Sequence, residues 1–261
     1  MGMTAGEGAR PIVLVHSSDV HIDDGAGKGP GNGNTGLAAI LRTAEALGAD
    51  LVLLAGDTFD NPRVSKPVLE RTGELMAASR IPVVMLPGNH DPLLANCIFR
   101  RAGLPDLAHV GILGLTHDQA IVFDHLDLEI RGKAHRSFDD MHPLLDAHPR
   151  RARRQVVMAH GHYVPDEEWR DQSHRSWLLS DAAIAATGAD YIALGHWDRP
   201  TPVGDGSVPA YYSGSPDLAG TVNVIRMAET VSVERVPLHW AEGDAVPPPY
   251  QSPPYRSPPS R

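Results

Sequence analysis

The chain has 261 residues, 42% of them hydrophobic, which is enough to bury a substantial core, and we expect one main folded domain. Its formal net charge of −9 gives no general attraction to nucleic acid, so binding to nucleic acid would need a local basic patch. A single cysteine excludes an internal disulfide, and no apolar run approaches the ~20 residues that cross a membrane. We therefore expect a cytoplasmic protein without membrane contact.

The first half of the chain alternates apolar runs of strand length with segments of helical spacing. Strands are predicted at 12–16, 51–57 and 81–91, and helices at 37–47 and 64–79. The glycine-rich stretch 23–34 predicts a loop, and Thr35 is placed to cap the helix that follows. Because the strand runs are continuously apolar, they indicate parallel pairing with both faces of the sheet covered.

The second half contains shorter and more numerous runs. Strands at 109–115, 119–124 and 126–132 indicate a meander or a second sheet, strands at 155–162 and 190–198 flank a helix near 178–187, and antiparallel strands are predicted at 210–216, 221–227 and 230–236. The proline-rich end predicts a polyproline-like tail, with a docking peptide as its alternative role. We divide the chain into a disordered N-terminus (1–10), a folded domain (11–240) and a disordered tail (241–261).

Polar side chains follow five of these predicted strands at the same end. They are Asp19 and His21, Asp57, Asn89 and His90, His160, and His196. In an α/β sheet the carboxyl ends of the strands are where ligands bind, so these groups are expected to converge on one site. Each motif alone has an ordinary reading as a turn, but five in order favour a site. The mixed nitrogen and oxygen donors suit divalent transition metals, and their number suits two ions that share one carboxylate.

These motifs resemble those of the calcineurin-like metallophosphoesterase superfamily over roughly 12–237. The resemblance rests on "DVH" (19–21), "GDTFD" (56–60), "GNHD" (88–91), His160 and Gly195-His196. Within the superfamily, "HSSDVHID", "GDTFDNPRVS" and "YYSGSP" are most similar to the SbcD-like DNA-repair exonuclease branch. Protein serine/threonine phosphatases match less well, because Asn61-Pro62 stands where they carry Arg-Gly.

The resemblance implies an α/β fold, a two-sheet β-sandwich flanked by helices in an αββα arrangement, with two divalent ions at one edge. The ions are expected to be manganese, with iron or zinc as alternatives. The implied ligands are Asp19, His21 and Asp57 for the first ion and Asp57, Asn89, His160 and His196 for the second. His90 would be the general acid outside both sets, because the unperturbed pKa of imidazole, near 6.5, suits that role.

The last motif departs from the family pattern. The family carries Gly-His-x-His, and this chain has Asp198 in place of the second histidine. In an extended segment residues i and i+2 point to the same side, so we expect Asp198 to bind the first ion through a carboxylate oxygen beside His196. The alternatives are a weakened first site, or a loop residue that caps a turn before Pro200. Trp197, next to the site, is a candidate substrate-binding wall.

The function expected from these residues is metal-dependent hydrolysis of phosphodiester bonds, nuclease-like in character. One alternative is a phosphomonoesterase or a phosphodiesterase of cyclic or small dinucleotides, and another is a non-catalytic metal-binding scaffold. The basic run 148–154 is the one obvious phosphate-attracting patch, and its other reading is a solvated loop. Nucleic acid as a substrate and the ATPase of the nuclease branch as a partner are left undecided. That branch carries a DNA cap and partner-binding helices where this chain has only a short segment after Pro237.

Overall fold

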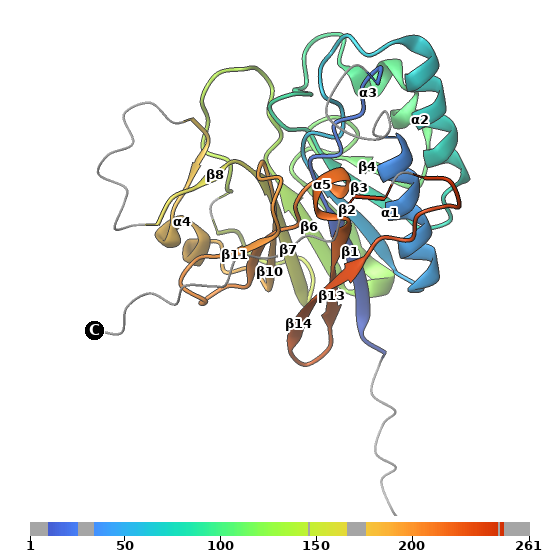
Figure 1. Ribbon diagram of the computed structural model, residues 1–261. Helices are drawn as coiled ribbons and strands as arrows, with labels where there is room; N and C mark the ends of the chain where they lie inside the picture. Colours follow the sequence, from blue (N-terminus) through green and yellow to red (C-terminus); the bar gives the residue numbers. More distant parts are fainter. Residues whose placement is uncertain (1–9, 26–33, 146, 166–175, 245, 248–261) are drawn as a thin grey trace, which may run out of the picture.

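The computed structural model describes residues 10–25, 34–145, 147–165, 176–244 and 246–247. Within them two six-stranded sheets lie face to face, and helices cover the outer side of each (Figure 1). This is the αββα sandwich that the sequence motifs imply. Almost all of the expected disordered N-terminus, most of the glycine-rich loop and most of the proline-rich tail lie outside the described residues.

The first sheet contains the strands that were predicted to be parallel. Its order is β14 (Val231–Pro237), β13 (Thr221–Met227), β1 (Ile12–Ser17), β2 (Leu51–Ala55), β3 (Val83–Leu86) and β4 (Val110–Ile112). Strands β1 to β4 pair in parallel, and β13 and β14 extend the sheet in antiparallel pairing. The predicted strand at 109–115 therefore does not belong to a meander. It continues the parallel sheet beside β3.

The second sheet has the order β11 (Thr201–Val203), β12 (Ala210–Tyr212), β10 (Tyr191–Gly195), β7 (Arg154–His160), β6 (Leu128–Gly132) and β5 (Ala120–Phe123). Strands β6, β7, β10 and β12 are parallel, so the antiparallel pairing expected for 210–216 holds only toward β11. A small parallel pair, β8 (His162–Tyr163) and β9 (Leu178–Leu179), stands beside this sheet.

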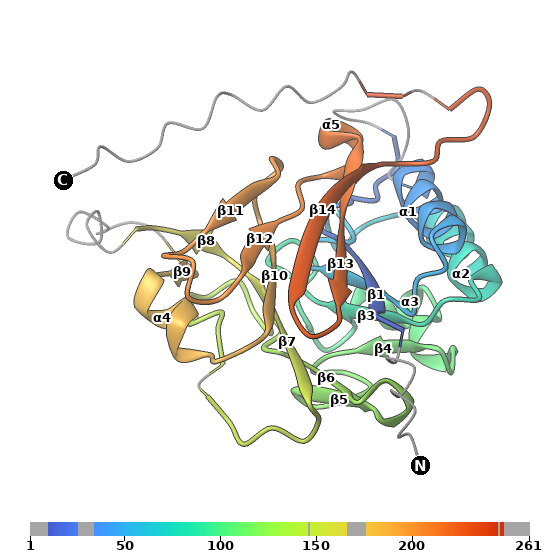
Figure 2. The same cartoon turned by 90° about the horizontal axis from the view of Figure 1, so that it is seen from below.

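Short helices complete the layers (Figure 2). They are α1 (Asn34–Ala46), α2 (Lys66–Ala78), α3 (Ile98–Arg101), α4 (Asp181–Ala186) and α5 (Pro216–Ala219), with 3-10 turns η1 (Leu104–Asp106) and η2 (Asp124–Leu126). Thr35 lies inside α1 and does not cap it, and the predicted helix at 178–187 begins later because Leu178 and Leu179 form β9. Ser180 caps α4, since its hydroxyl accepts the Ala183 N–H.

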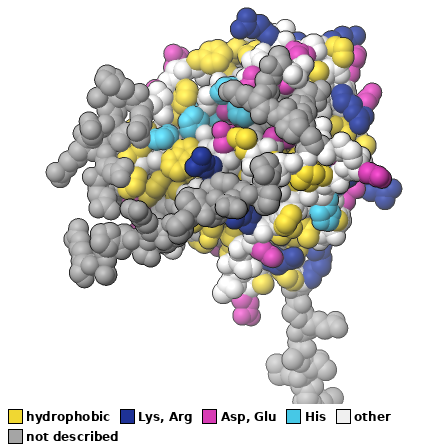
Figure 3. Space-filling model, in the orientation of Figure 1, with side chains coloured by type: hydrophobic (Ala, Val, Ile, Leu, Met, Phe, Trp, Pro, Cys, Tyr) yellow, Lys and Arg dark blue, Asp and Glu magenta, His cyan; other side chains and the backbone are white. Residues whose placement is uncertain are grey.

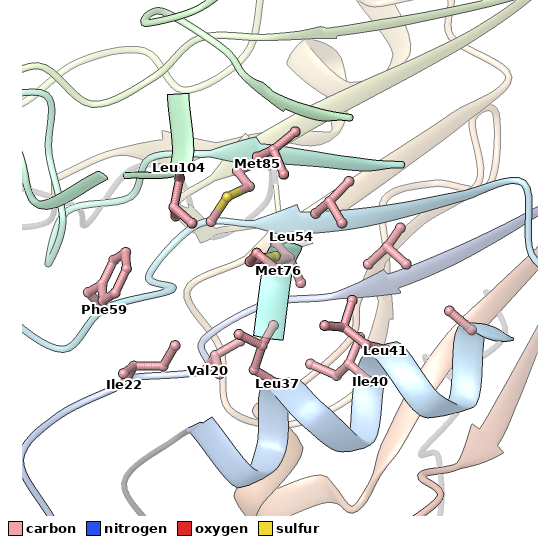
Figure 4. Packing of buried hydrophobic residues seen from close by; sticks show 14 of the residues in the cluster. Val20, Ile22, Leu37, Ile40, Leu41, Leu54, Phe59, Met76, Met85 and Leu104 are labelled. Atoms are coloured by element: carbon pink, nitrogen blue, oxygen red, sulfur yellow. The ribbon is translucent and has the colours of Figure 1, made fainter. Parts of the chain in front are cut away.

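Three apolar layers hold the sandwich together. Alternate residues of β1, such as Leu14, face the second sheet, while Val15 and its equivalents face α1 and α2. In the outer layer, Leu37 and Ile40 of α1 point toward the strands (Figure 4). Each such buried side chain contributes roughly 1.5–3 kcal/mol. The continuous apolar strands are thus explained by burial on both faces.

The arginines of the basic run lie at the surface, paired with acidic residues. The ion pairs join Arg150 and Arg154 to Asp190, Arg151 to Glu129 and Arg153 to Asp127, at 2.7–3.7 Å. The run also leads into β7, which begins at Arg154, whereas His160 ends that strand. The reading as a solvated loop before a strand is therefore favoured. Among the described helices none is both long and apolar enough to cross a membrane.

Candidate metal centre

The strand ends that carry the predicted ligands come from two sheets, not from one. Strands β1, β2 and β3 of the first sheet and β7 and β10 of the second bring their carboxyl ends to one edge of the sandwich. On that side of the molecule, histidine and acidic side chains gather within a small area (Figure 3). The convergence that the sequence predicted is therefore present, but it depends on the packing of the two layers.

The backbone is unusual at these residues. Asp19, His21 and Asp57 have φ angles of 52°, 50° and 51°, and His196 has 105°. Left-handed backbone costs energy for residues with a Cβ and is concentrated at functional sites. The loops after β1 and β2 support each other, because Asp19 donates its N–H to the Gly56 carbonyl at 3.0 Å and His21 to the Asp57 carbonyl at 3.1 Å.

One group of donor atoms surrounds Asp57, His160 and His196. The Nε2 atom of His160 lies 3.0 Å from Asp57 Oδ2 and 3.0 Å from Asn89 Oδ1. The same amide oxygen lies 3.1 Å from His196 Nδ1. The Ala55 carbonyl, 2.9 Å away, accepts from His160 Nδ1 and so turns Nε2 toward the group. Two imidazoles, a carboxylate and an amide oxygen are a donor set that fits a divalent transition metal.

The electrostatics of this group depend on a buried charge pair. Burial opposes a charge on His160, but the adjacent Asp57 carboxylate raises the His160 pKa to about 9. Burial would likewise raise the pKa of Asp57, and the charge of His160 holds it below its ordinary value. Burial lowers the pKa of His196 to about 3, so its imidazole is neutral and available as a ligand. A cation between these groups would supply the positive charge that the Asp57 carboxylate needs.

A second group contains Asp19, His21 and again Asp57, with their donor atoms within 4.8 Å of one another. Asp19 is buried, which raises its pKa, and its carboxylate accepts the Ser18 hydroxyl at 2.5 Å. The His196 N–H also donates to both carboxylate oxygens of Asp19, at 3.1 and 3.0 Å. Asp57 thus belongs to both groups, at the position where a bridging carboxylate would lie.

His90 stands at the outer rim. Its side chain is 44% exposed, and its Nδ1 atom lies 2.7 Å from the main-chain carbonyl oxygen of Asp60. Its own N–H donates to Asp57 Oδ1 at 2.9 Å, which ties the "GNHD" turn to the centre. Asp91 of that turn is fully buried and accepts from the Gly88 and Phe59 N–H groups. Asp91 therefore holds the turn together and does not orient His90.

The structure places Asp198 apart from these groups. The chain bends at His196, so the extended geometry that would align residues 196 and 198 is absent. Asp198 is exposed, and its carbonyl accepts the Ser215 N–H at 3.1 Å. It is not in any group of ligating side chains found among the described residues. Its role as a ligand stays a prediction.

Trp197 is packed between two side chains. Its ring stacks on Tyr212 with centroids 4.7 Å apart and 7° between the planes. The indole N–H donates to His162 Nδ1 at 3.1 Å, and the His162 ring lies 6.2 Å from that of His196. Trp197 is thus close to the centre, but Tyr212 covers one of its faces.

Three residues of the site were not assigned a role from the sequence. His135 is buried and lies 2.9 Å from the His160 carbonyl through Nε2, while the Trp177 ring is 5.9 Å from that of His196. Neither follows a recognisable motif, and only the packing of β6 and β9 brings them here. Asp60 is different, because it closes the "GDTFD" motif, and its Oδ1 lies 3.2 Å from His21 Nδ1. Its position in the motif was a signal that could have been used.

Comparisons with known proteins agree with this geometry. The family described as calcineurin-like phosphoesterase matches residues 12–200. A curated relative, the SbcD subunit of the nuclease SbcCD from Bacillus subtilis (strain 168), is 25% identical over 224 residues, which cover 70% of this chain and 55% of that protein. The chain therefore spans about half the length of the curated relative it matches.

Solved structures show the same fold at low identity. The protein TT1561 of Thermus thermophilus superposes with a TM-score of 0.58 at 10% identity, covering 87% of this chain and 99% of that chain. A second crystal structure gives a TM-score of 0.56 at 12% identity and covers 88% and 100% of the two chains. At identities this low, the likeness shows a shared fold and says nothing about activity or substrate.

Proposed function

The chain belongs to the calcineurin-like phosphoesterase family, and on that premise we propose that it hydrolyses phosphodiesters at a dinuclear metal centre. Membership makes it a metal-dependent hydrolase of phosphoester bonds. The observation that carries the dinuclear proposal is Asp57, whose carboxylate is common to two of the three groups of ligating atoms found among the described residues, the third being His21, Asp60 and His90. The preference for a diester is supported by the similarity to the B. subtilis nuclease subunit.

The residues divide into two ligand sets around that carboxylate. We assign Asp19, His21 and Asp57 to the first ion, and Asp57, Asn89, His160 and His196 to the second. Divalent ions bound there supply the Lewis-acid chemistry that makes water a nucleophile near neutral pH and stabilises charge on phosphate oxygens. Asn89 is a neutral ligand, so it adds no negative charge to a site that must accept an anionic ester.

His90 is suited to act on the leaving group. Since its Nδ1 is engaged by the Asp60 carbonyl, Nε2 is left for the substrate, and the side chain is exposed at the rim. An imidazole there can protonate the departing oxygen as general acid. Trp197 lies on the second-sheet side of the centre, next to His162, and we assign it to the wall beside a base or an aromatic leaving group.

A specific observation also favours small substrates. The arginines of the basic run are held in ion pairs, and they lie before or at the start of β7, whose other end carries His160. Long nucleic acids depend on cationic contacts to many phosphates, and the chain has a net charge of −9. A phosphodiesterase of cyclic or short dinucleotides is therefore the second candidate.

Metal-stripped protein, reloaded separately with manganese, iron or zinc, should be assayed on bis-p-nitrophenyl phosphate, p-nitrophenyl phosphate, a dinucleotide and single-stranded DNA. We expect metal-dependent hydrolysis of the diesters to exceed that of the monoester. A preference for the monoester would make the protein a phosphatase. Two bound ions with no hydrolysis of any substrate would favour the scaffold.

His90→Asn tests the general acid, with the exposed His125→Asn as the matched control. We expect two ions to remain bound while turnover falls about 10²–10⁴-fold on alkyl diesters, which need a proton on the leaving group. Nitrophenolate departs without a proton from the enzyme, so turnover of nitrophenyl diesters should fall far less. Equal losses on both kinds of ester would remove the general-acid role, and loss of metal would make His90 a ligand.

A further inference from the structure

We propose that the Asp60 carboxylate is the outer partner of His21, fixing this ligand for the first metal, while only the main chain of Asp60 serves His90. The inference rests on the dinuclear centre proposed above. It concerns the last residue of the "GDTFD" motif, which is outside the two ligand sets assigned above but lies in a third group of potential donors with His21 and His90. Three observations carry it: the position of the His21 ring, the division of contacts at Asp60, and the way the two loops are tied together.

The His21 ring lies between two carboxylates. Its Nε2 atom lies 4.0 Å from Asp19 Oδ1, on the side of the metal group, and its Nδ1 atom lies 3.2 Å from Asp60 Oδ1. Nδ1 is enclosed, and among the described residues it has no aligned hydrogen-bond partner. A neutral imidazole holds its proton on one nitrogen and binds metal with the other. A carboxylate beside Nδ1 favours the tautomer that leaves Nε2 free.

Asp60 serves its two neighbouring histidines with different atoms. The main-chain oxygen lies 2.7 Å from His90 Nδ1, whereas the carboxylate Oδ1 is 3.8 Å from that nitrogen. A separation of 3.8 Å is beyond hydrogen-bond distance. Removing the side chain of Asp60 should therefore leave the support of His90 in place. The two functions can be separated by one substitution.

The position of Asp60 is fixed by the neighbouring loop. Its N–H donates to the Ile22 carbonyl at 3.0 Å, and Phe59 forms a parallel bridge with Ile22. Phe59 is fully buried and packs edge-on against Phe99, with ring centroids 5.5 Å apart. The side chain itself is 40% exposed, and its Oδ2 accepts the Asn61 side-chain N–H at 3.2 Å, so it is held by these contacts more than by burial.

This placement matters because the first ion has few other ligands. Asp198 is exposed where the family carries a second histidine, so the donors grouped around His21 are Asp19 and Asp57 on one side and Asp60 and His90 on the other, and we assign only Asp19, His21 and Asp57 to the ion. A site with three protein ligands depends strongly on how each one is oriented. Loss of a carboxylate that orients a ligating histidine typically lowers metal affinity about 10–100-fold.

Metal binding to metal-stripped protein should be measured by calorimetric titration with manganese for the wild type, Asp60→Ala and Asp60→Asn. The exposed Asp118→Asn is the matched control. We expect the Kd of the weaker, first site to rise about 10–100-fold in Asp60→Ala and less in Asp60→Asn, which keeps an acceptor oxygen. The second site should be unchanged. The ratio of rates on alkyl and nitrophenyl diesters should also stay as in the wild type.

Nitrogen NMR of the metal-free protein gives a readout that needs neither ions nor turnover. At a pH where His21 is neutral, we expect its proton on Nδ1 in the wild type and a mixture of tautomers in Asp60→Ala. Unchanged tautomer populations with an unchanged first-site Kd would overturn the inference. If the ratio of the rate on alkyl diesters to the rate on nitrophenyl diesters falls in Asp60→Ala as it does in His90→Asn, the Asp60 carboxylate supports His90 instead. Fewer than two ions in the wild type would refute the dinuclear centre, while the tautomer would still test Asp60.

Discussion

The loop after β2, residues 56–60, and the segment at the end of β10, residues 195–198, start in the same way and end differently. Each begins with a glycine and continues with a candidate ligand of positive φ, Asp57 or His196. A Cβ on Gly56 would overlap the His160 ring at Nδ1, and one on Gly195 would overlap the Ala55 carbonyl oxygen. Both loops therefore need a residue without a side chain where the two sheets approach each other.

The difference lies in the aspartate that ends each loop, Asp60 or Asp198. Asp60 is carried back to His21 because its loop pairs with the loop after β1. Asp198 is carried outward, since Trp197 stacks on Tyr212 and the Asp198 carbonyl is bound by Ser215. The comparison teaches that spacing along the chain does not decide which carboxylate reaches a site. The neighbouring segment decides it.

The largest effect is expected for Asp57→Asn, in the loop that also carries Asp60. Its carboxylate belongs to both ligand groups, so both ions should bind more weakly. We expect a loss of affinity and turnover greater than the roughly 10–100-fold that is typical of an outer partner. Metal content by mass spectrometry and diester hydrolysis measure it, with Asp118→Asn as control. Two ions retained at wild-type affinity would contradict the bridging position.

Gly195→Ala tests whether the second loop needs a residue without a side chain at the end of β10. The added methyl would overlap the Ala55 carbonyl oxygen, and overpacking of this kind costs about 1–3 kcal/mol in unfolding free energy. Urea unfolding measures the loss. At Gly188, with a φ of 60° and nothing within 4 Å, alanine should cost only about 1–2 kcal/mol of backbone strain. Equal losses at both positions would show that the sheets tolerate the methyl.

The smallest effect is expected at Asp198. If its carboxylate binds the first ion, Asp198→Ala should weaken that site, although less than Asp60→Ala because the side chain is exposed. Asp198→His restores the residue that the family carries and should keep both ions. The same calorimetric titration measures these variants. Tight binding of two ions with unchanged turnover in Asp198→Ala would remove Asp198 from the ligand set.

The sequence predicts the strands, the main helices and the clustering of Asp19, Asp57 and His160, because apolar runs and strand-end motifs are local features. It does not predict which strands become neighbours. The segment at 110–112 joined the first sheet, and 210–212 paired in parallel with β10, since pairing depends on contacts distant in the chain. Trp177 reaches the site in the same way. The ligand roles themselves stay predictions.

The two layers of the sandwich meet at the centre, the first providing Asp57 and Asn89 and the second His160 and His196. An ion held by all four would act as a clamp between the layers, opposing any sliding of one sheet over the other. Ligand binding to the folded state alone adds about 2.7 kcal/mol of stability at a hundredfold excess over Kd. The free energy of unfolding of the whole sandwich would then depend on the concentration of free metal ion around the protein.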